Sequence, residues 1–340
     1  FFHKLAKASP TSFWTAISDQ FHHPAWNGFH FYDLIFPLFL FIAGVATPYS
    51  LENRLKKGDT QSQLLKHVIQ RGLILVLLGI IYNNGLQIKP LSEIRFGSVL
   101  GRIGLAYMFA NIIFLYTKQK GQIIWFTMLL IGYWLLLRFT SAPGFPAGDL
   151  TMEGNFTSYF DRLFLPGKLY QTIHDPEGIL ATIPAIGTGL MGILTGNFFK
   201  NGKYTPLRKT IILTLAGIIS LVLSLIWNLD FPINKNLWTS SFVLCTGGFS
   251  LLLIALFYYI VDVRGFQKWA FPLKVIGMNS ILIYLAGEFI SWKYTNEALF
   301  KWLGQLVGEQ YGPVALAVTV ILVQWAFLYF LYKKKIFLKV

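Results

Sequence analysis

Charged residues are scarce in this chain of 340 residues, at 13% of the total, whereas a soluble domain carries about 25%. Hydrophobic residues make up 54% of the sequence, and the mean hydropathy is +0.54. This shortage of charge excludes an ordinary soluble globular protein. It indicates an integral membrane protein that sits in a lipid bilayer.

Cysteine is almost missing as well, because Cys245 is the only one in the sequence. One cysteine cannot build a disulfide framework, and exported proteins from oxidising compartments often rely on such bonds. The composition therefore favours a bacterial inner (cytoplasmic) membrane. The glycosylation tripeptide Asn155-Phe156-Thr157 favours a secretory-pathway membrane instead, although such tripeptides also occur by chance.

Alternating ten-residue segments, which are typical of membrane β-barrels, are also absent. The apolar segments are instead about 17–24 residues long, which suits α-helices that cross a hydrocarbon core of about 30 Å. The sequence predicts an all-α polytopic helical bundle that forms one transmembrane domain over residues 1–340. The nine predicted spans are 31–51, 68–83, 101–116, 123–139, 177–198, 210–228, 239–262, 275–290 and 313–332.

The chain has a formal net charge of +14, and the positions of its cations indicate what that charge does. Most lysines and arginines lie in the loops after the first, third, fifth and seventh spans and in a tail that includes Lys339. Loops rich in Lys and Arg stay in the cytoplasm. We therefore expect residues 1–30 to be exported, and the charge to set orientation rather than to bind nucleic acid. An exported start without a signal peptide predicts a further helix before residue 1, hence ten spans in a full-length protein.

The exported loops contain groups that are suited to holding a sugar. The largest, over residues 140–176, is broken by prolines and glycines but rich in aromatic residues, so we expect a folded loop over the bundle. Asp175, at the end of this loop, and Glu177, directly after it, are expected to open the fifth span. Asn234 and Asn236 lie in another exported loop, where their amides can bind hydroxyl groups or simply cap helices and turns.

The stretch "FHHPAWNGFHFYDLIFPLFLFIAG" at residues 21–44 places histidines and one carboxylate where a polar segment meets a membrane span. Ionisable groups at such edges are functional candidates, because burying them is costly. A histidine such as His23 suits general-base work, and a carboxylate such as Asp33 would orient it. A structural role for His23 as an interfacial anchor is the alternative. No HExxH or Cys/His ligand spacing is present, so we expect no metal.

Further stretches follow in order along nearly the whole chain: "GRIGLAY", "DPEGILATI", "INKNLWTSSFV", "VDVRG", "GMNSILIY" and "YKKKIF". Together with "HPAWNG" and "DLIFPLFLFIAG", they resemble the heparan-α-glucosaminide N-acetyltransferase family, which includes bacterial transmembrane glucosamine N-acetyltransferases. The resemblance implies transfer of acetyl from cytoplasmic acetyl-CoA to a glucosamine amine on the exported side. It makes His23, four residues before Asn27, the general base or acetyl carrier, with Asp33 as its partner. The family's Asp-Arg motif would fall before residue 1.

The same resemblance suggests roles for other residues. Trp26 and Asn27 are expected to bind the amino sugar, as are the acidic and amide residues of the exported loops. Arg102, Asn279 and Ser280 are expected to line the path of acetyl-CoA, although Asn279 and Ser280 also suit hydrogen bonding between membrane helices. A sugar or glycolipid transporter on the same scaffold is the alternative function. Assembly into a homodimer is left open.

Overall fold

The computed structural model describes residues 1–338, so Lys339 lies outside the described residues. Within that range the regular elements are all helical, which confirms the predicted all-α class. The chain divides into two compact units. The larger contains residues 24–29 and 33–259, and the smaller contains residues 1–23, 30–32 and the chain from 260 onward. The single-domain organisation stays a prediction.

The helices confirm a polytopic membrane protein. Among residues 1–338, eight helices are long and apolar enough to cross a membrane, and a bent pair brings the number of spans to as many as nine. In the larger unit these helices are α3 (Ile35–Lys56), α4 (Gln61–Asn84), α5 (Val99–Tyr116), α6 (Gln119–Phe139), α8 (Thr182–Lys200), α9 (Pro206–Trp227) and α10 (Ser240–Tyr258). The smaller unit contributes α14 (Gly312–Lys333).

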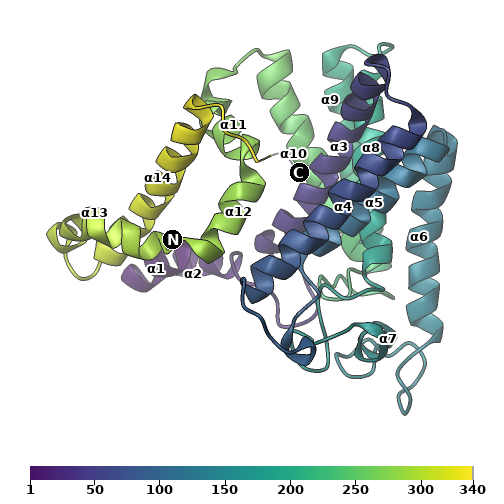
Figure 1. Cartoon of the computed structure of the whole chain (residues 1–340), viewed down its shortest axis with the longest axis horizontal. Helices are drawn as coiled ribbons and strands as arrows, with labels where there is room; N and C mark the ends of the chain where they lie inside the picture. Colours follow the sequence, from purple (N-terminus) through teal and green to yellow (C-terminus); the bar gives the residue numbers. More distant parts are fainter. Residues whose placement is uncertain (339–340) are drawn as a thin grey trace. The chain divides into compact units, whose positions relative to one another are not determined.

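Helix α8 is the centre of the larger unit, where it packs against α3, α5, α6 and α10 (Figure 1). Its contact with α3 is close because the facing residues are small. A Cβ added at Gly44 would lie 2.2 Å from the Gly189 carbonyl oxygen, and one at Gly192 would lie 2.1 Å from that of Phe41. Small residues allow membrane helices to approach in this way. The tight α3–α8 pair fixes the first predicted span against the core.

Several helices begin at residues other than those predicted. Thr60 and Gln63 form a capping box, so α4 begins at Gln61 instead of 68. Thr205 caps α9, which begins at Pro206 instead of 210. The fifth span starts later, at Thr182, and not at 177. Hydropathy locates the apolar part of a helix, whereas capping side chains determine where it begins.

The large loop over residues 140–176 is folded and contains α7 (Phe156–Phe164). Asn155 caps this helix by accepting a hydrogen bond from the Ser158 backbone N–H. Its amide also donates to the Thr151 and Met152 carbonyl oxygens, and the residue is fully buried. Asn155 is therefore a structural cap, and the tripeptide that it begins is not exposed as a glycosylation acceptor.

The smaller unit combines α14 with short helices: α1 (Phe2–Ala8), α2 (Ser12–Asp19), α11 (Phe271–Met278), α12 (Ser280–Phe289) and α13 (Trp292–Val307). The predicted span over 275–290 is wrong as a single helix, because the chain bends by 56° between α11 and α12. Asn279 lies at the break, donates to the Ile336 carbonyl oxygen at 2.9 Å and accepts from the Leu338 N–H at 3.0 Å. Its amide therefore holds the tail at the position where helical hydrogen bonding stops.

Candidate functional site

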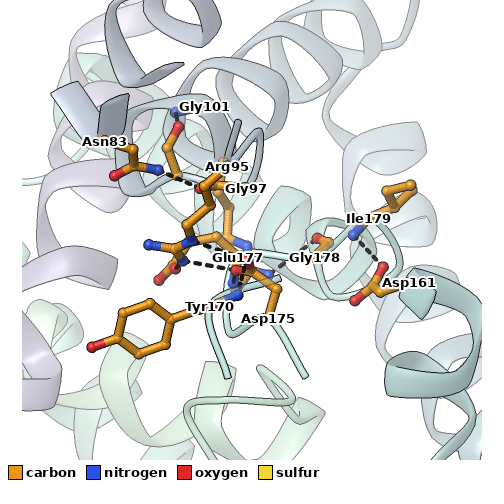
Figure 2. A network of polar contacts seen from close by, with 12 residues as sticks. Asn83, Arg95, Gly97, Gly101, Asp161, Tyr170, Asp175, Glu177, Gly178 and Ile179 are labelled. Carbon is orange, nitrogen blue, oxygen red and sulfur yellow. Dashed lines mark hydrogen bonds and ion pairs between the residues drawn. The ribbon is translucent and has the colours of Figure 1, made fainter. Parts of the chain in front are cut away.

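Arg95 joins two loops of the larger unit (Figure 2). Its Nε and Nη2 donate to the two oxygens of Asp175 at 2.9 and 2.8 Å, and Nη2 also donates to Glu177 at 2.6 Å. The guanidinium lies 4.4 Å from the centre of the Tyr170 ring. Two-point binding of a carboxylate is strong and directional. The loop before α5 is thereby fixed to the loop before α8.

The Asp175 carboxylate is fully engaged by these contacts. It is completely buried and also accepts the backbone N–H groups of Tyr170 and Glu177, at 3.0 and 2.9 Å. Burial raises the pKa of Asp175, but hydrogen bonding and ion pairing with Arg95 outweigh burial and lower it. Burial likewise lowers the pKa of Arg95, and its bonds to Asp175 raise it further than burial lowers it. Both groups stay charged, and Asp175 serves as a structural support of the loop.

The turn after Asp175 differs from the sequence prediction. Asp175 and Glu177 do not open the fifth helix, because the Asp175 side chain accepts the Glu177 N–H and forms a turn instead. The turn continues to Gly178, where an added Cβ would lie 1.7 Å from Oδ2 of Asp161 (Figure 2). The close approach of α7 requires glycine at this position.

Asp161 is the buried carboxylate that contacts this turn. Its Oδ1 accepts the Ile179 N–H at 2.8 Å, whereas its Oδ2 has no hydrogen-bond partner among the described residues. Burial raises the pKa of Asp161 to about 7, against the opposing effect of the Ile179 N–H. A carboxyl group with this pKa is partly protonated at neutral pH. Asp161 can therefore hold or release a proton beside Gly178.

Arg102 lies in the first turn of α5 and also contacts Gly178. Its side chain is buried, with the residue 2% exposed, and its Nη2 donates to the Gly178 carbonyl oxygen at 3.2 Å. The guanidinium lies 5.2 Å from the centre of the Trp238 ring. Its Nε and Nη1 have no hydrogen-bond partner within residues 1–338. Two nitrogens of a buried cation are thus left to donate to oxygen atoms of a ligand.

Arg102 also lines a pocket of about 350 Å³. Its walls are mainly apolar, with Phe96, Leu105 and Ile186 among them, and its polar groups include Arg102 and Glu177. Small-molecule sites commonly have this size and this mixture of apolar walls with few polar groups. The pocket can hold a slender ligand whose carbonyl or similar oxygen meets Arg102.

The Trp-Asn-Gly segment is attached to two other loops of the larger unit. The Trp26 indole N–H donates to the Leu150 carbonyl oxygen at 2.8 Å, and the Gly28 N–H donates to that of Ile233 at 2.8 Å. The Asn234 side chain donates to Oδ1 of Asn27 at 3.0 Å. The structure thus brings together Asn27 and Asn234, which are far apart in the sequence and were both expected to bind a sugar.

Asn234 and Asn236 differ in how they are held. Asn234 is fully buried, and its Oδ1 accepts the Leu237 N–H at 2.9 Å, so it caps its own turn as well as contacting Asn27. Asn236 lies half-buried in the same turn. The contact of either amide with a sugar hydroxyl stays a prediction.

Asp33 is buried at the start of the first span, in the short helix η1 (Phe31–Leu34). Its carboxylate lies 3.7 Å from Nζ of Lys235, which is next to Asn234. Burial lowers the pKa of Lys235, and the charge of Asp33 opposes this effect. Asp33, Lys235, Asn234 and Asn27 therefore form one continuous polar cluster, named here the acceptor cluster.

His174 connects α7 with Trp26. Ser158 accepts a hydrogen bond from the Asn155 amide and shares a 2.7 Å hydrogen bond with Nδ1 of His174. Burial lowers the pKa of His174 to about 4, so the ring is neutral at pH 7. The ring meets Trp26 edge to face at 5.2 Å between centroids. His174 thus helps to fix the orientation of Trp26.

The N-terminal histidines belong to the smaller unit. Nδ1 of His22 lies 2.9 Å from the Ser18 carbonyl oxygen, and Nδ1 of His30 lies 2.9 Å from that of His22. His23 is exposed, with its ring 4.7 Å from that of Tyr32. His22 therefore has a structural contact with α2. His23 and Asp33 fall in different units, so their predicted pairing is not tested.

Other predicted residues lie elsewhere in the chain. Asn279 and Ser280 are at the α11–α12 break in the smaller unit, where Asn279 holds the tail. Their predicted role in binding acetyl-CoA is not tested. Within residues 1–338, no group of three His, Cys, Asp or Glu side chains could hold a metal ion. The expectation that no metal takes part stays a prediction.

Three residues of the site were missed by the sequence reasoning: Arg95, Asp161 and Lys235. The signal for Lys235 was its position between two asparagines next to a span. No comparable signal exists for Arg95 or Asp161, because their partners lie on segments distant in the sequence.

Comparison with known proteins found two curated proteins that are similar to this chain. No family model matches it. It is 31% identical over 378 residues to the heparan-alpha-glucosaminide N-acetyltransferase of Mus musculus and 30% identical over 376 residues to that of Homo sapiens. Each match covers 94% of this chain and 56% of the relative, so the chain spans about half the length of these curated proteins. The motifs, the helical membrane architecture and this similarity agree in relating the chain to the heparan-alpha-glucosaminide N-acetyltransferases over that length.

Proposed function

We propose that the protein is a transmembrane N-acetyltransferase that moves acetyl from cytoplasmic acetyl-CoA to the amine of glucosamine, or of a terminal glucosaminide, on the exported side. The observation that carries this proposal is the similarity to two curated N-acetyltransferases over 94% of the chain. The acceptor cluster supports it, because it groups amides, a carboxylate and a cation that suit an amino sugar.

In the proposed reaction, the amine nitrogen attacks the thioester carbonyl carbon, the carbon–sulfur bond breaks and the thiolate of CoA leaves. The amine must lose a proton, which His23 accepts as general base and later releases to the thiolate or to water. Asp33 stabilises the protonated ring. In the alternative two-step route, His23 itself receives the acetyl group and then passes it to the amine. Both routes require the same histidine.

The donor would enter from the basic cytoplasmic side, where Lys and Arg attract its phosphates. Its pantetheine arm is long and thin and carries carbonyl oxygens. The pocket beside Arg102 suits such an arm, because it combines apolar walls with two open N–H donors. We further propose that Asn279 and Ser280 contact the donor and that Trp26, Asn27, Glu177 and Asn236 contact the sugar. Asp175 acts by holding Glu177 in place.

The setting of the reaction is also a proposal. The cation-rich loops orient the chain with residues 1–30 exported. The near absence of cysteine favours a bacterial inner membrane over an oxidising compartment. Acetyl-CoA and an amino sugar are the expected partners in the bilayer, and nucleic acid is not one. A homodimer would be compatible with this arrangement.

One observation favours a transporter as the second candidate function. The α11–α12 pair is a helix broken by 56° at Asn279, and discontinuous helices often bind substrates in secondary transporters. A transporter would move glucosamine across vesicle membranes without consuming acetyl-CoA. The two functions are therefore distinguished by following both the sugar and the acetyl group in the same proteoliposomes.

The test of the proposal is acetyl transfer by purified protein with labelled acetyl-CoA and glucosamine. General bases contribute about 10²–10⁴-fold, so His23→Ala should lose at least that much turnover while the protein stays folded. His22→Ala is the matched control and should lose far less, because its contact is with the Ser18 backbone. Asp33→Asn should fall between the two or approach His23→Ala.

Two outcomes would overturn the proposal. Near-normal turnover in a folded His23→Ala protein removes His23 from the mechanism. Uptake of glucosamine by proteoliposomes without any acetyl transfer by the unaltered protein would replace the transferase with the transporter.

A further inference from the structure

A second cavity of the larger unit lies between α6 and α9, apart from the candidate site. Helix α10 packs against both helices and forms the floor of the cavity with Leu244. The cavity is a groove of about 580 Å³ with almost wholly apolar walls, which include Phe126 and Ile131 of α6 and Leu223 and Ile226 of α9. Its volume falls within the range of small-molecule sites, about 300–1,000 Å³.

One end of this groove is polar. The indole N–H of Trp134 donates to Oδ2 of Asp230 at 2.7 Å, and Nε of Arg138 lies 3.5 Å from Oδ1 of the same carboxylate. Trp227 completes this end, with its ring edge to face against Trp134 at 5.9 Å between centroids. The Arg138 and Asp230 side chains are 52% and 46% exposed, so both are open to a ligand.

The two charges keep most of their hydrogen-bonding capacity. The Arg138–Asp230 separation of 3.5 Å is longer than a well-formed hydrogen bond, which measures about 2.7–3.2 Å. The groove therefore presents a cation and an anion side by side above an apolar trough. Two indoles at the same level are typical of the boundary between hydrocarbon and headgroups.

We infer that this groove binds a zwitterionic aminophospholipid of the phosphatidylethanolamine type. One acyl chain lies between α6 and α9, the phosphate accepts from Arg138, and the ammonium donates to Asp230. A purely anionic headgroup would satisfy Arg138 but leave Asp230 facing negative charge. A choline headgroup has no N–H to donate to Asp230. The pattern of charges thus favours the lipid with a primary amine.

The occupant is a lipid because of where the groove lies. Its three helices are long and apolar enough to cross the membrane, and its wall residues are exposed: Leu223 by 49% and Ile131 by 42%. In a bilayer, acyl chains cover such surfaces. The headgroup contacts make one class of lipid bind longer than the others.

The experiment is native mass spectrometry of the full chain, released from nanodiscs that contain equal amounts of phosphatidylethanolamine, phosphatidylcholine and phosphatidylglycerol. The ethanolamine lipid should be retained preferentially. Loss of one charge-assisted hydrogen bond costs about 1.5–3 kcal/mol, or roughly 10–100-fold in affinity. Asp230→Asn should therefore remove the preference for ethanolamine, and Arg138→Gln should lower retention of all three lipids.

Matched variants separate the groove from the rest of the surface. Leu223→Trp fills the groove and should abolish retention, whereas Leu215→Trp, on the same helix and outside the groove, should leave it unchanged. Lys120→Gln removes a cation from the other end of α6 and controls for charge. Equal retention of the three lipids, or retention that survives Leu223→Trp, would overturn the inference. So would a second copy of the chain covering this face in place of lipid.

Discussion

Arg95, which is partly buried, and Arg102, which is buried, lie on either side of the start of α5 and differ in how their hydrogen bonds are satisfied. Arg95 bonds to two carboxylates and lies over an aromatic ring. Arg102 makes one bond, to the Gly178 carbonyl oxygen, and two of its nitrogens have no partner in the described chain. Both arginines contact the same loop, Arg95 at Asp175 and Glu177 and Arg102 at Gly178.

The difference distinguishes a structural cation from one that is available to a ligand. A buried charge that is fully hydrogen-bonded fixes the geometry of its neighbours. One with open donors costs free energy in the unliganded protein, and that cost is recovered when a ligand supplies the missing oxygens. Arg95 therefore holds the loops, and Arg102 is the better candidate for binding a ligand.

The largest effect is expected at Arg95. Arg95→Met would leave Asp175 buried without its cation, and breaking a buried pair in this way costs about 3–5 kcal/mol of the free energy of unfolding. Thermal denaturation in detergent should show a large loss of Tm. Arg208→Met, at an exposed position, is the control and should change Tm little. Equal Tm values for the two variants would contradict the structural role of Arg95.

Asp161, which contacts the same loop, allows a test of the loop by its stability as a function of pH. Its pKa is about 7 in the folded chain and about 3.9 when unfolded, so folding favours the protonated form. Its contribution to stability is therefore full below pH 4 and is lost as pH rises to 7, with an upper limit of about 4 kcal/mol. Asp161→Asn cannot ionise and should escape this loss.

The measurement is the Tm of Asp161→Asn minus that of the unaltered protein between pH 4 and 8. The difference should grow with pH and level off above about 7. A difference that shrinks as pH rises would mean that Asp161 ionises readily and has a partner.

The smallest effect on folding is expected at Arg102. Arg102→Met removes a buried cation and keeps the volume, so Tm should fall much less than for Arg95→Met. Acetyl transfer should instead fall by roughly 10–100-fold, as one or two charge-assisted hydrogen bonds to the donor are lost. If Arg102→Met were as unstable as Arg95→Met but had normal activity per folded molecule, Arg102 would be a structural arginine and not one that binds a ligand.

The sequence reasoning located the membrane helices well but misjudged their boundaries. Hydropathy is a local property, so eight spans could be read directly from the chain. It did not reveal that Asp175 turns the chain before α8, because that turn depends on a side chain accepting a backbone N–H. Nor did it reveal α13, whose mixture of charged and apolar residues is not typical of a span.

The candidate site was predictable only in part. Asn27, Asn234 and Asp33 could be selected from their residue types and motifs. Their arrangement depends on contacts between distant segments, such as the 3.0 Å bond between Asn27 and Asn234. Lys235 was missed for the same reason, since its importance comes from lying 3.7 Å from Asp33.

By itself, the sequence determined that this protein is a helical membrane protein, how its charges are distributed between loops, and which family it resembles. These are properties of composition, local hydropathy and ordered motifs. Only the tertiary structure decided that Arg95 is satisfied and Arg102 is not, because a hydrogen bond depends on atomic positions supplied by separate parts of the chain. The same residue type at two neighbouring sites therefore acquired two different roles.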